Sequence, residues 1–239
     1  MRIFFFVIIL ISSLSLLAQP KPPVKNDKDG ASGATPSYAI SGNARLTTNF
    51  IERGLSMSDN DVALNALFLV NLGSQFKFGF WGSNVSDLNT TDDNLWIKYI
   101  AEVYIEFQPS SKFHFYIHDE HFFKVDLRNG QRFGFEISYP KFSLLLERQT
   151  NFEGTGTTAH YYQFKYYQRL TDTYGGIGSF GYTQQRSAQY NDYFDNAATG
   201  YYKPFEKGQI ELGVTLPSNT SQFGSRSKLN YFLAFALEY

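Results

Sequence analysis

The 239-residue chain contains no cysteine. This absence excludes a disulfide-stapled scaffold, a thiolate metal site and a lipid-modified N-terminal cysteine. An excess of charge of one sign is also lacking, because 21 Lys and Arg residues balance 22 Asp and Glu residues to a formal net charge of -1. Proteins that bind nucleic acids are normally basic, so the sequence predicts no nucleic-acid partner.

Motifs for catalysis and metal binding are scarce as well. The chain has no nucleophile elbow, and residues 175–178 (Gly-Gly-Ile-Gly) lack phosphate-binding spacing. His114, His118, Glu120 and His121 are one cluster of metal-ligand residue types. On a strand, His114 and His118 would lie about 13 Å apart, too far to share a zinc ion, although His118 to His121 could meet in an outer loop. We therefore predict no catalytic residue, metal ion or cofactor, and keep an outer-membrane hydrolase as a lesser alternative.

Long apolar runs are confined to the N-terminus. Residues 3–17 are almost purely apolar and follow a single positive charge at Arg2. This run is shorter than the ~20 residues that span a bilayer, so it predicts a cleavable signal peptide over residues 1–18 rather than a retained anchor. Residues 19–37 are rich in Lys, Pro, Asp, Gly and Ser, and this composition predicts a disordered periplasmic tether.

The remaining residues, 38–239, are rich in aromatic side chains and alternate with period two. The whole chain has 17 Tyr and 24 Phe. Phe76, Phe78 and Phe80 would share one face of a strand, and residues 97–107 place apolar side chains at odd positions and mostly polar ones at even positions. This period predicts β-strands, and no comparable 3.6-residue period indicates helices.

About twelve such segments follow one another, and short and long connections alternate between them. The short connections are expected near residues 73–74, 109–110, 139–140, 171–172 and 205–208, and the long ones at 54–61, 86–94, 119–130, 150–157, 185–190 and 217–227. An even strand number with short turns on one rim is typical of outer-membrane barrels. The sequence predicts an all-β fold, a transmembrane antiparallel up-and-down β-barrel over residues 38–239 in the bacterial outer membrane, with periplasmic termini.

A soluble β-sandwich or lipocalin-like barrel is the structural competitor, since it has alternating strands too. Such a protein would present a wet outer face that is rich in charge. Only 18% of the residues here are charged, and the apolar faces are heavy in Phe and Tyr. These proportions favour lipid outside and a polar lumen.

The last strand carries a further signal. Its alternate residues, all apolar or aromatic, are Tyr231, Leu233, Phe235, Leu237 and Tyr239. The segment resembles the terminal recognition strand of outer-membrane barrels, which ends on an aromatic residue. The resemblance implies that lipids contact this face and that the barrel assembly machinery binds the strand.

Two early stretches narrow the resemblance. Residues 46–59 (LTTNFIERGLSMSD) and 79–85 (GFWGSNV) resemble the opening strands of the TorF-type porin family of proteobacterial outer-membrane proteins. Glu52 and Met57 depart from the aromatic residue and the Gln expected there. The resemblance implies membrane passage without a defined substrate.

The polar faces predict which side chains line the lumen. These residues are Arg45, Arg53, Lys77, Trp81, Lys98, Glu102, Glu106 and Lys165. The predicted function is a channel that passes small hydrophilic solutes, in which Arg53 is either a selectivity charge or a structural partner of an acidic residue such as Glu102 or Glu106. The alternative is a closed barrel with a structural or adhesion role through its loops. Its lumen would be filled by Trp81, Trp96, Tyr104, Tyr161 and Tyr167.

Overall fold

The computed structural model describes residues 38–86, 95–123, 128–218 and 221–239. The predicted signal peptide and tether lie outside these residues. Twelve strands close into one antiparallel barrel, and two short strands form a separate hairpin. Within the described part of the chain, no helix has the length and apolar character needed to cross a membrane. The all-β barrel predicted from the sequence is confirmed.

Ten of the twelve barrel strands have nine or more residues, the length that crosses a bilayer when tilted, and the other two have eight. Their bounds are β1 (Tyr38–Thr47), β4 (Ala63–Leu72), β5 (Phe76–Ser83), β6 (Trp96–Gln108), β7 (Ser111–Phe122), β8 (Gly130–Ser138), β9 (Phe142–Gln149), β10 (Ala159–Arg169), β11 (Tyr174–Gln185), β12 (Tyr193–Phe205), β13 (Gly208–Ser218) and β14 (Asn230–Glu238). The separate hairpin consists of β2 (Ile51–Glu52) and β3 (Leu55–Ser56). Two 3₁₀ segments, η2 (Phe152–Gly154) and η3 (Ser221–Ser227), lie in connections.

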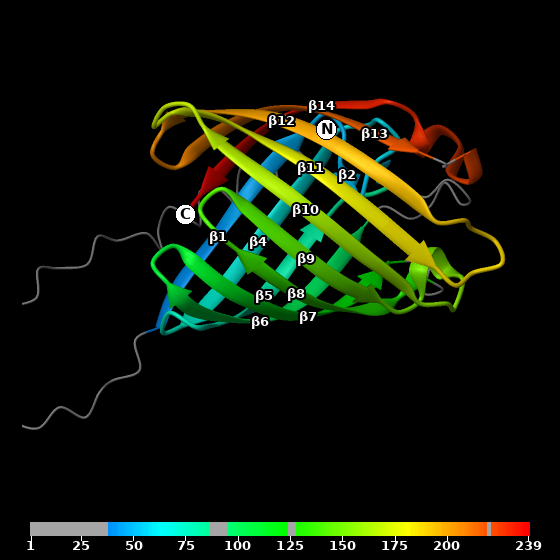
Figure 1. The fold of residues 1–239 in the computed structure, drawn as a ribbon, viewed down its shortest axis with the longest axis horizontal. Helices are drawn as coiled ribbons and strands as arrows, with labels where there is room; N and C mark the ends of the chain where they lie inside the picture. The colour runs from blue at the N-terminus through cyan, green and yellow to red at the C-terminus, as the bar shows by residue number, and fades with distance from the viewer. Residues whose placement is uncertain (1–37, 87–94, 124–127, 219–220) are drawn as a thin grey trace, which may run out of the picture. The chain divides into compact units, whose positions relative to one another are not determined.

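The barrel has the up-and-down order predicted from the sequence. Each strand from β4 to β14 pairs with its neighbour in the chain, and β1 pairs with both β4 and β14. The closing pair runs in register from Asn43 opposite Glu238 to Thr47 opposite Ala234. Figure 1 shows the strands running obliquely around the barrel. The count of twelve is therefore confirmed.

The connections separate into two rims, which we call the short-turn rim and the long-loop rim. The short-turn rim holds residues 73–75, 109–110, 139–141, 170–173 and 206–207, together with the start of β1 and the end of β14. Figure 1 shows the short turns gathered at one end and the longer connections at the other. The structure thus reproduces the asymmetry expected of an outer-membrane barrel.

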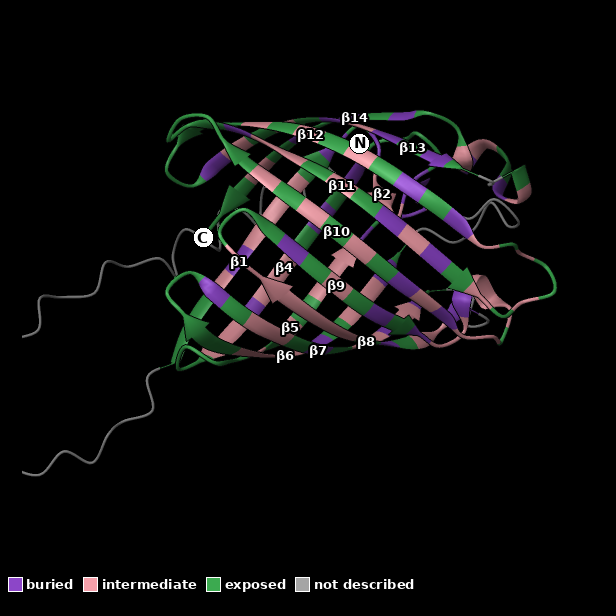
Figure 2. Ribbon diagram, viewed as in Figure 1, coloured by how far each residue is buried: buried purple, intermediate pink, exposed green. Residues whose placement is uncertain are grey.

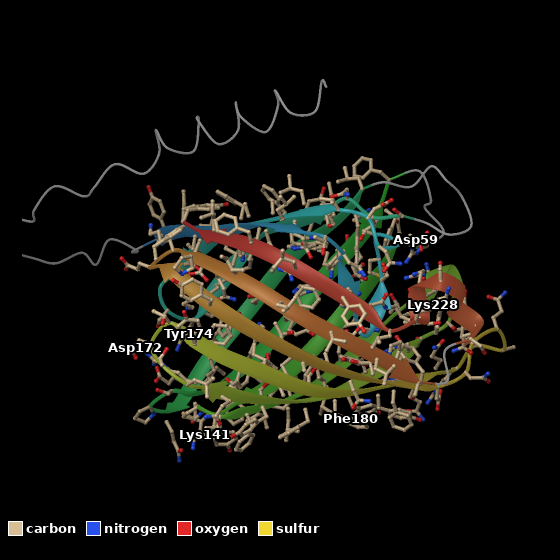
Figure 3. The ribbon with its side chains drawn as sticks, turned by 90° about the horizontal axis from the view of Figure 1, so that it is seen from above. Asp59, Lys141, Asp172, Tyr174, Phe180 and Lys228 are labelled. Atoms are coloured by element: carbon tan, nitrogen blue, oxygen red, sulfur yellow. The ribbon has the colours of Figure 1, made fainter. Side chains whose placement is uncertain are left out.

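The outer face of the barrel is apolar, since side chains alternate between lumen and exterior along each strand. Figure 2 shows the resulting alternation of exposed and less exposed residues. Phe80 is 50% exposed and Leu233 is 51% exposed, and the Phe180 side chain points away from the barrel in Figure 3. A face of this kind, aromatic and aliphatic, is suited to lipid. The terminal strand also presents Tyr231 and Tyr239 outward, and its recognition by the assembly machinery stays a prediction.

Two boundaries differ from the sequence-based expectation. The first strand was expected to reach Arg53, but β1 ends at Thr47. The Thr47 hydroxyl donates a hydrogen bond of 2.8 Å to the Asn49 carbonyl, which turns the chain out of the sheet. Residues from 119 onward were expected in a loop, but β7 continues to Phe122, because β6 offers backbone partners along this whole length.

Candidate functional site

The segment that follows β1 folds into the barrel instead of extending beyond it. We call residues 48–58 the lumen hairpin. Ile51 pairs with Ser56 and Glu52 pairs with Leu55. The two residues at the turn, Arg53 and Gly54, have φ values of 48° and 78°, the positive pair typical of a type I′ hairpin turn.

Polar side chains fix the base of the lumen hairpin. The Asn49 side-chain carbonyl accepts a hydrogen bond of 2.7 Å from the Ser56 hydroxyl, and the Phe50 amide donates one of 3.0 Å to the Ser58 hydroxyl. The Met57 amide donates to the Phe50 carbonyl at 2.7 Å. Buried backbone groups need such partners, so these bonds allow the hairpin to leave the sheet.

The tip of the hairpin touches the wall of the barrel on β12, β13 and β14. The Gly54 carbonyl accepts a hydrogen bond of 3.2 Å from the Asn230 side-chain amide and lies 3.5 Å from the Thr215 hydroxyl. A Cβ added at Gly54 would lie 2.6 Å from the Asp195 Cβ and 3.2 Å from the Pro217 Cβ. Only glycine fits between the tip and this wall.

An ion cluster joins the other side of the hairpin to β6, β7, β8 and β9. Its members are three cations and three carboxylates: Arg53, Lys98, Arg132, Glu52, Glu120 and Glu147. Their formal charges cancel. Burying a charge is costly unless it is paired, so this balance is what allows six ionised groups to fill the lumen.

Arg132 is the centre of the ion cluster. Its guanidinium lies 2.6 Å from Glu52, 2.7 Å from Glu120 and 3.4 Å from Glu147. Lys98 approaches two of the same carboxylates, Glu52 at 3.2 Å and Glu120 at 3.6 Å. The Glu120 side chain is fully buried and also accepts a hydrogen bond of 3.1 Å from the Gln149 side-chain amide.

Arg53 lies in the lumen as an ion-pair residue, but the acidic partner expected from the sequence was wrong. It pairs with Glu147 on β9 rather than with Glu102 or Glu106 on β6. It also donates a hydrogen bond of 2.9 Å to Gln149, and its guanidinium carbon lies 4.8 Å from the centre of the Tyr161 ring. The turn at Gly54 carries Arg53 across the barrel, which brings it to β9.

The electrostatic surroundings keep the Glu52 carboxyl ionised. Burial is the largest influence and acts to raise its pKa, but the neighbouring charges of Arg132, Lys98 and Arg53 outweigh burial and hold the pKa well below its usual range. Glu52 is therefore negatively charged at neutral pH, as the balanced ion cluster requires.

Aromatic side chains seal the hairpin against β5, β6 and β7. Phe50 contacts Trp81 and Trp96, with ring centres 5.5 and 6.2 Å apart, and Trp96 stacks on Phe122 at 4.8 Å. Met57 is buried in the same cluster. Aromatic surfaces of this size exclude water, so this side of the hairpin is packed rather than hydrated.

A very small cavity lies beside the hairpin. This cavity of about 20 Å³ lies between the hairpin, the ion cluster and the long-loop rim, lined by residues that include Glu52, Arg53, Trp96, Arg132 and Tyr193. This volume accommodates about one water molecule. The hairpin and the ion cluster thus occupy the half of the lumen near the long-loop rim.

Two salt bridges join the loops above the hairpin, and we call this pair the loop clamp. Glu153 in η2 lies 3.0 Å from Arg128 and 2.9 Å from Arg226 in η3. The Arg226 side chain also donates a hydrogen bond of 2.8 Å to the Ser56 carbonyl of the hairpin. Burial raises the pKa of Glu153, but Arg128 and Arg226 outweigh it and lower the pKa to about 2.

The loop clamp should weaken in acid. Because the pKa of Glu153 falls from an ordinary 4.5 to about 2 on folding, its stabilising effect is complete above pH 4.5 and is lost as the pH falls toward 2. We expect hydrogen exchange at residues 150–158 and 221–227, corrected for intrinsic rates, to accelerate across this window. Glu153→Gln should exchange rapidly at pH 6 and show no such transition. Equal protection of both proteins at pH 6 would contradict this role for Glu153.

The half of the lumen near the short-turn rim has different chemistry. Glu102 accepts a hydrogen bond of 2.7 Å from the Tyr104 hydroxyl and lies 3.6 Å from His114 and 3.5 Å from His118. Beyond them, at the rim, lies a cavity of about 370 Å³. Its lining residues are Ser74, Gln75, Lys77, Tyr104, Glu106, Ser110, Ser111 and Lys112. The lumen thus holds the hairpin at one end and a cavity at the other.

The histidines that drew attention in the sequence are divided between the two faces of β7. His114 and His118 point into the lumen toward Glu102, whereas His121 lies on the outer face beside Asp119 at 2.8 Å. The prediction that His118 and His121 could meet in an outer loop is therefore wrong, since both residues belong to β7. No group of three or more metal-ligand side chains was found among the described residues.

The structure places the predicted lumen residues at three levels. Trp81, Lys98 and Arg53 lie at the hairpin, and Glu102 lies in the middle of the lumen. Lys77, Glu106 and Lys165 lie toward the short-turn rim, and Arg45 pairs with Glu211 at 2.9 Å. Their roles in passage stay predictions.

Four members of the ion cluster were missed by reasoning from the sequence alone. Glu52 was noted only as a departure from a family pattern, Glu120 was considered only within the histidine cluster, and Arg132 and Glu147 were not considered as lining residues. A signal was available for the last two. Arg132 and Glu147 lie at the inward positions of strands whose alternate, outward positions are apolar. The alternation alone therefore places both side chains in the lumen.

Comparison with known proteins supports the architecture. A model of a family described as bacterial proteins of unknown function (Gcw_chp) matches residues 31–112. Comparison with curated protein sequences gave no match. The fold is similar to that of the KdgM porin, with a TM-score of 0.54 and 10% sequence identity over 83% of this chain and 98% of that chain.

Two further solved structures share the barrel. One, from a study of the in-meso crystallization of membrane proteins, gives a TM-score of 0.58 and 8% identity over 85% of this chain and 83% of that chain. The other is the KdgM porin in complex with disordered oligogalacturonate. It gives a TM-score of 0.50 and 11% sequence identity over 85% of this chain and 98% of that chain. At sequence identities this low, the structural similarity establishes a common fold and nothing more. Together with the apolar outer face, this fold indicates that the protein resides in the bacterial outer membrane.

Proposed function

We propose that the protein is an outer-membrane channel for small hydrophilic solutes and that the lumen hairpin holds it closed in the described state. The main support is that a separate hairpin occupies the lumen, where it contacts the ion cluster on one side and β12 to β14 on the other. Closure depends on a segment attached to the barrel at its two ends, and such a segment can move without unfolding a strand.

Charge balance favours an opening of this kind. When the hairpin withdraws, it takes with it one positive and one negative charge, Arg53 and Glu52. Lys98, Arg132, Glu120 and Glu147 remain on the wall, again with a net charge of zero. At this level, the wall of the open lumen would therefore be polar and charge-balanced rather than left with a single unpaired charge.

Two similarities support the same proposal. Residues 46–59 and 79–85 resemble TorF-type porins, and the fold is similar to that of a protein named as a porin. One structure of that porin holds an oligogalacturonate, which is consistent with a barrel of this architecture admitting a hydrophilic solute.

Liposome swelling tests the proposal. In the hairpin-shortened variant, Asn-Gly replaces residues 51–56, so that Phe50 and Met57 keep their hydrogen bond across a two-residue turn. We expect vesicles containing this variant to swell in arabinose at least tenfold faster than vesicles containing the native protein. A matched control lacks residues 187–189, part of another connection at the long-loop rim, and should behave as the native protein does.

The competing function is a permanently closed barrel that acts through its loops. The buried ion cluster and the aromatic seal favour it, because both fill the lumen with side chains. A hairpin-shortened variant that keeps the folded mobility of the barrel in unheated gels but admits no arabinose would overturn the channel proposal and establish this alternative.

A further inference from the structure

The half of the lumen near the short-turn rim carries lysines that have no carboxylate partner. These are Lys77 on β5, Lys112 on β7, Lys165 on β10 and Lys203 on β12, all close to the short-turn ends of their strands. Within the described ranges, no Asp or Glu oxygen lies within 4.0 Å of their ammonium groups. Every cation of the ion cluster, by contrast, has such a partner.

Two of these lysines converge on one aromatic ring. The ammonium nitrogens of Lys77 and Lys112 lie 4.5 and 4.9 Å from the centre of the Tyr104 ring. His114 stacks on the same ring at 4.2 Å. Both ammonium groups thus lie against the same ring at the wall of the 370 Å³ cavity, and with Glu106 as the one carboxylate of the lining they leave it an excess of one positive charge.

Polar groups that suit a hydroxylated molecule surround the two lysines. Ser74, Gln75, Ser110 and Ser111 line the cavity. Glu106 is the one acidic residue of the lining, and its carboxylate accepts a hydrogen bond of 3.3 Å from the Ser110 amide. This bond ties the negative charge to the turn, while the two ammonium groups stay available to a ligand.

We infer that this cavity, which we call the lysine vestibule, binds small hydroxylated organic anions. The ammonium groups of Lys77 and Lys112 take the carboxylate, and the serine and glutamine side chains take the hydroxyl groups. The volume of about 370 Å³ is within the range of small-molecule sites. Binding to the lysine vestibule is independent of conduction, whereas a preference for anions during passage rests on the proposed function.

Calorimetry with gluconate, and with glucose as a neutral comparison, tests the binding. We expect the native protein in detergent to bind gluconate at least tenfold more tightly than glucose, and Lys77→Gln with Lys112→Gln to remove this difference. The matched control is Lys141→Gln with Lys207→Gln, which removes two exposed lysines from turns on the same rim. Lys141 is labelled in Figure 3.

The outcomes separate the two proposals. Absent gluconate binding, or binding that survives loss of Lys77 and Lys112, overturns the lysine vestibule. In the hairpin-shortened variant, the reversal potential under a KCl gradient should indicate chloride preference that the same two substitutions reduce. A variant that binds gluconate but never conducts would overturn the proposed channel and leave the binding site intact.

Discussion

Replacing Gly54 by alanine will raise the fraction of time for which the barrel conducts by tenfold or more. The backbone at Gly54 has φ +78°, a left-handed conformation that costs an L-residue about 1–2 kcal/mol. The added Cβ would also lie 2.6 Å from the Asp195 Cβ, so the hairpin tip must withdraw from the wall. A tenfold change corresponds to about 1.4 kcal/mol, which the two effects together reach. Recordings of single channels in planar bilayers measure this fraction.

Gly156 provides a matched control for Gly54. It also has a positive φ, +70°, and it also lies in a connection at the long-loop rim, but an added Cβ would meet nothing within 4 Å. Gly156→Ala therefore introduces similar backbone strain without a clash, and the conducting fraction should change less than twofold. Equal effects of the two substitutions would show that strain in the loops, rather than the fit of the hairpin tip, controls conduction.

Replacing Arg132 by methionine will lower the free energy of unfolding by about 3–5 kcal/mol. The side chain is buried and approaches Glu52, Glu120 and Glu147 within 3.4 Å. Its loss leaves three carboxylates with two cations, and the fully buried Glu120 keeps Lys98 at 3.6 Å as its cation and the hydrogen bond of 3.1 Å from the Gln149 side-chain amide. Urea unfolding in lipid vesicles, followed by tryptophan fluorescence, measures the change.

Two further variants test whether the loss of stability comes from the unbalanced charge of the ion cluster. Lys165→Met removes a lumen lysine that has no carboxylate within 4.0 Å in the described part of the chain, and it should cost less than 1 kcal/mol. Glu120→Gln combined with Arg132→Met restores the charge balance and should recover part of the lost stability. Similar losses for Arg132→Met and Lys165→Met would contradict a stabilising ion cluster.

The barrel itself could be predicted because neighbouring residues of each strand face different environments and therefore differ in polarity. Lipid and lumen lie on opposite sides of each strand, so Tyr99 and Lys98 differ in polarity although they are adjacent. Short connections such as residues 109–110 then identify which strands pair, since two antiparallel strands joined by a tight turn are neighbours in the sheet. Each of these inferences uses local sequence alone.

The lumen hairpin could not be predicted in this way. Residues 47–52 (Thr-Thr-Asn-Phe-Ile-Glu) contain no glycine or proline that would end a strand, so they read as a continuation of the strand before them. The turn requires a left-handed conformation at Arg53, which is uncommon for a residue with a side chain. It is stabilised by contacts with distant strands, such as that of Gly54 with Asn230.

The partner of Arg53 was beyond reach for a related reason. Which inward residues share a level depends on the stagger between strands around the barrel. A strand's own pattern identifies Glu102 and Glu147 equally well as inward carboxylates, but does not give their height. The strand that faces Arg53 could therefore be identified only from the structure.

The current through single native barrels, compared with that through the hairpin-shortened variant, tests the closure of the lumen most directly. We predict that the native protein in planar bilayers stays closed for most of the recording, with brief openings. The hairpin-shortened variant should stay open, with steps at least as large. Native barrels that remain open, with steps of the same size and duration as those of the variant, would show that the lumen hairpin does not close the channel.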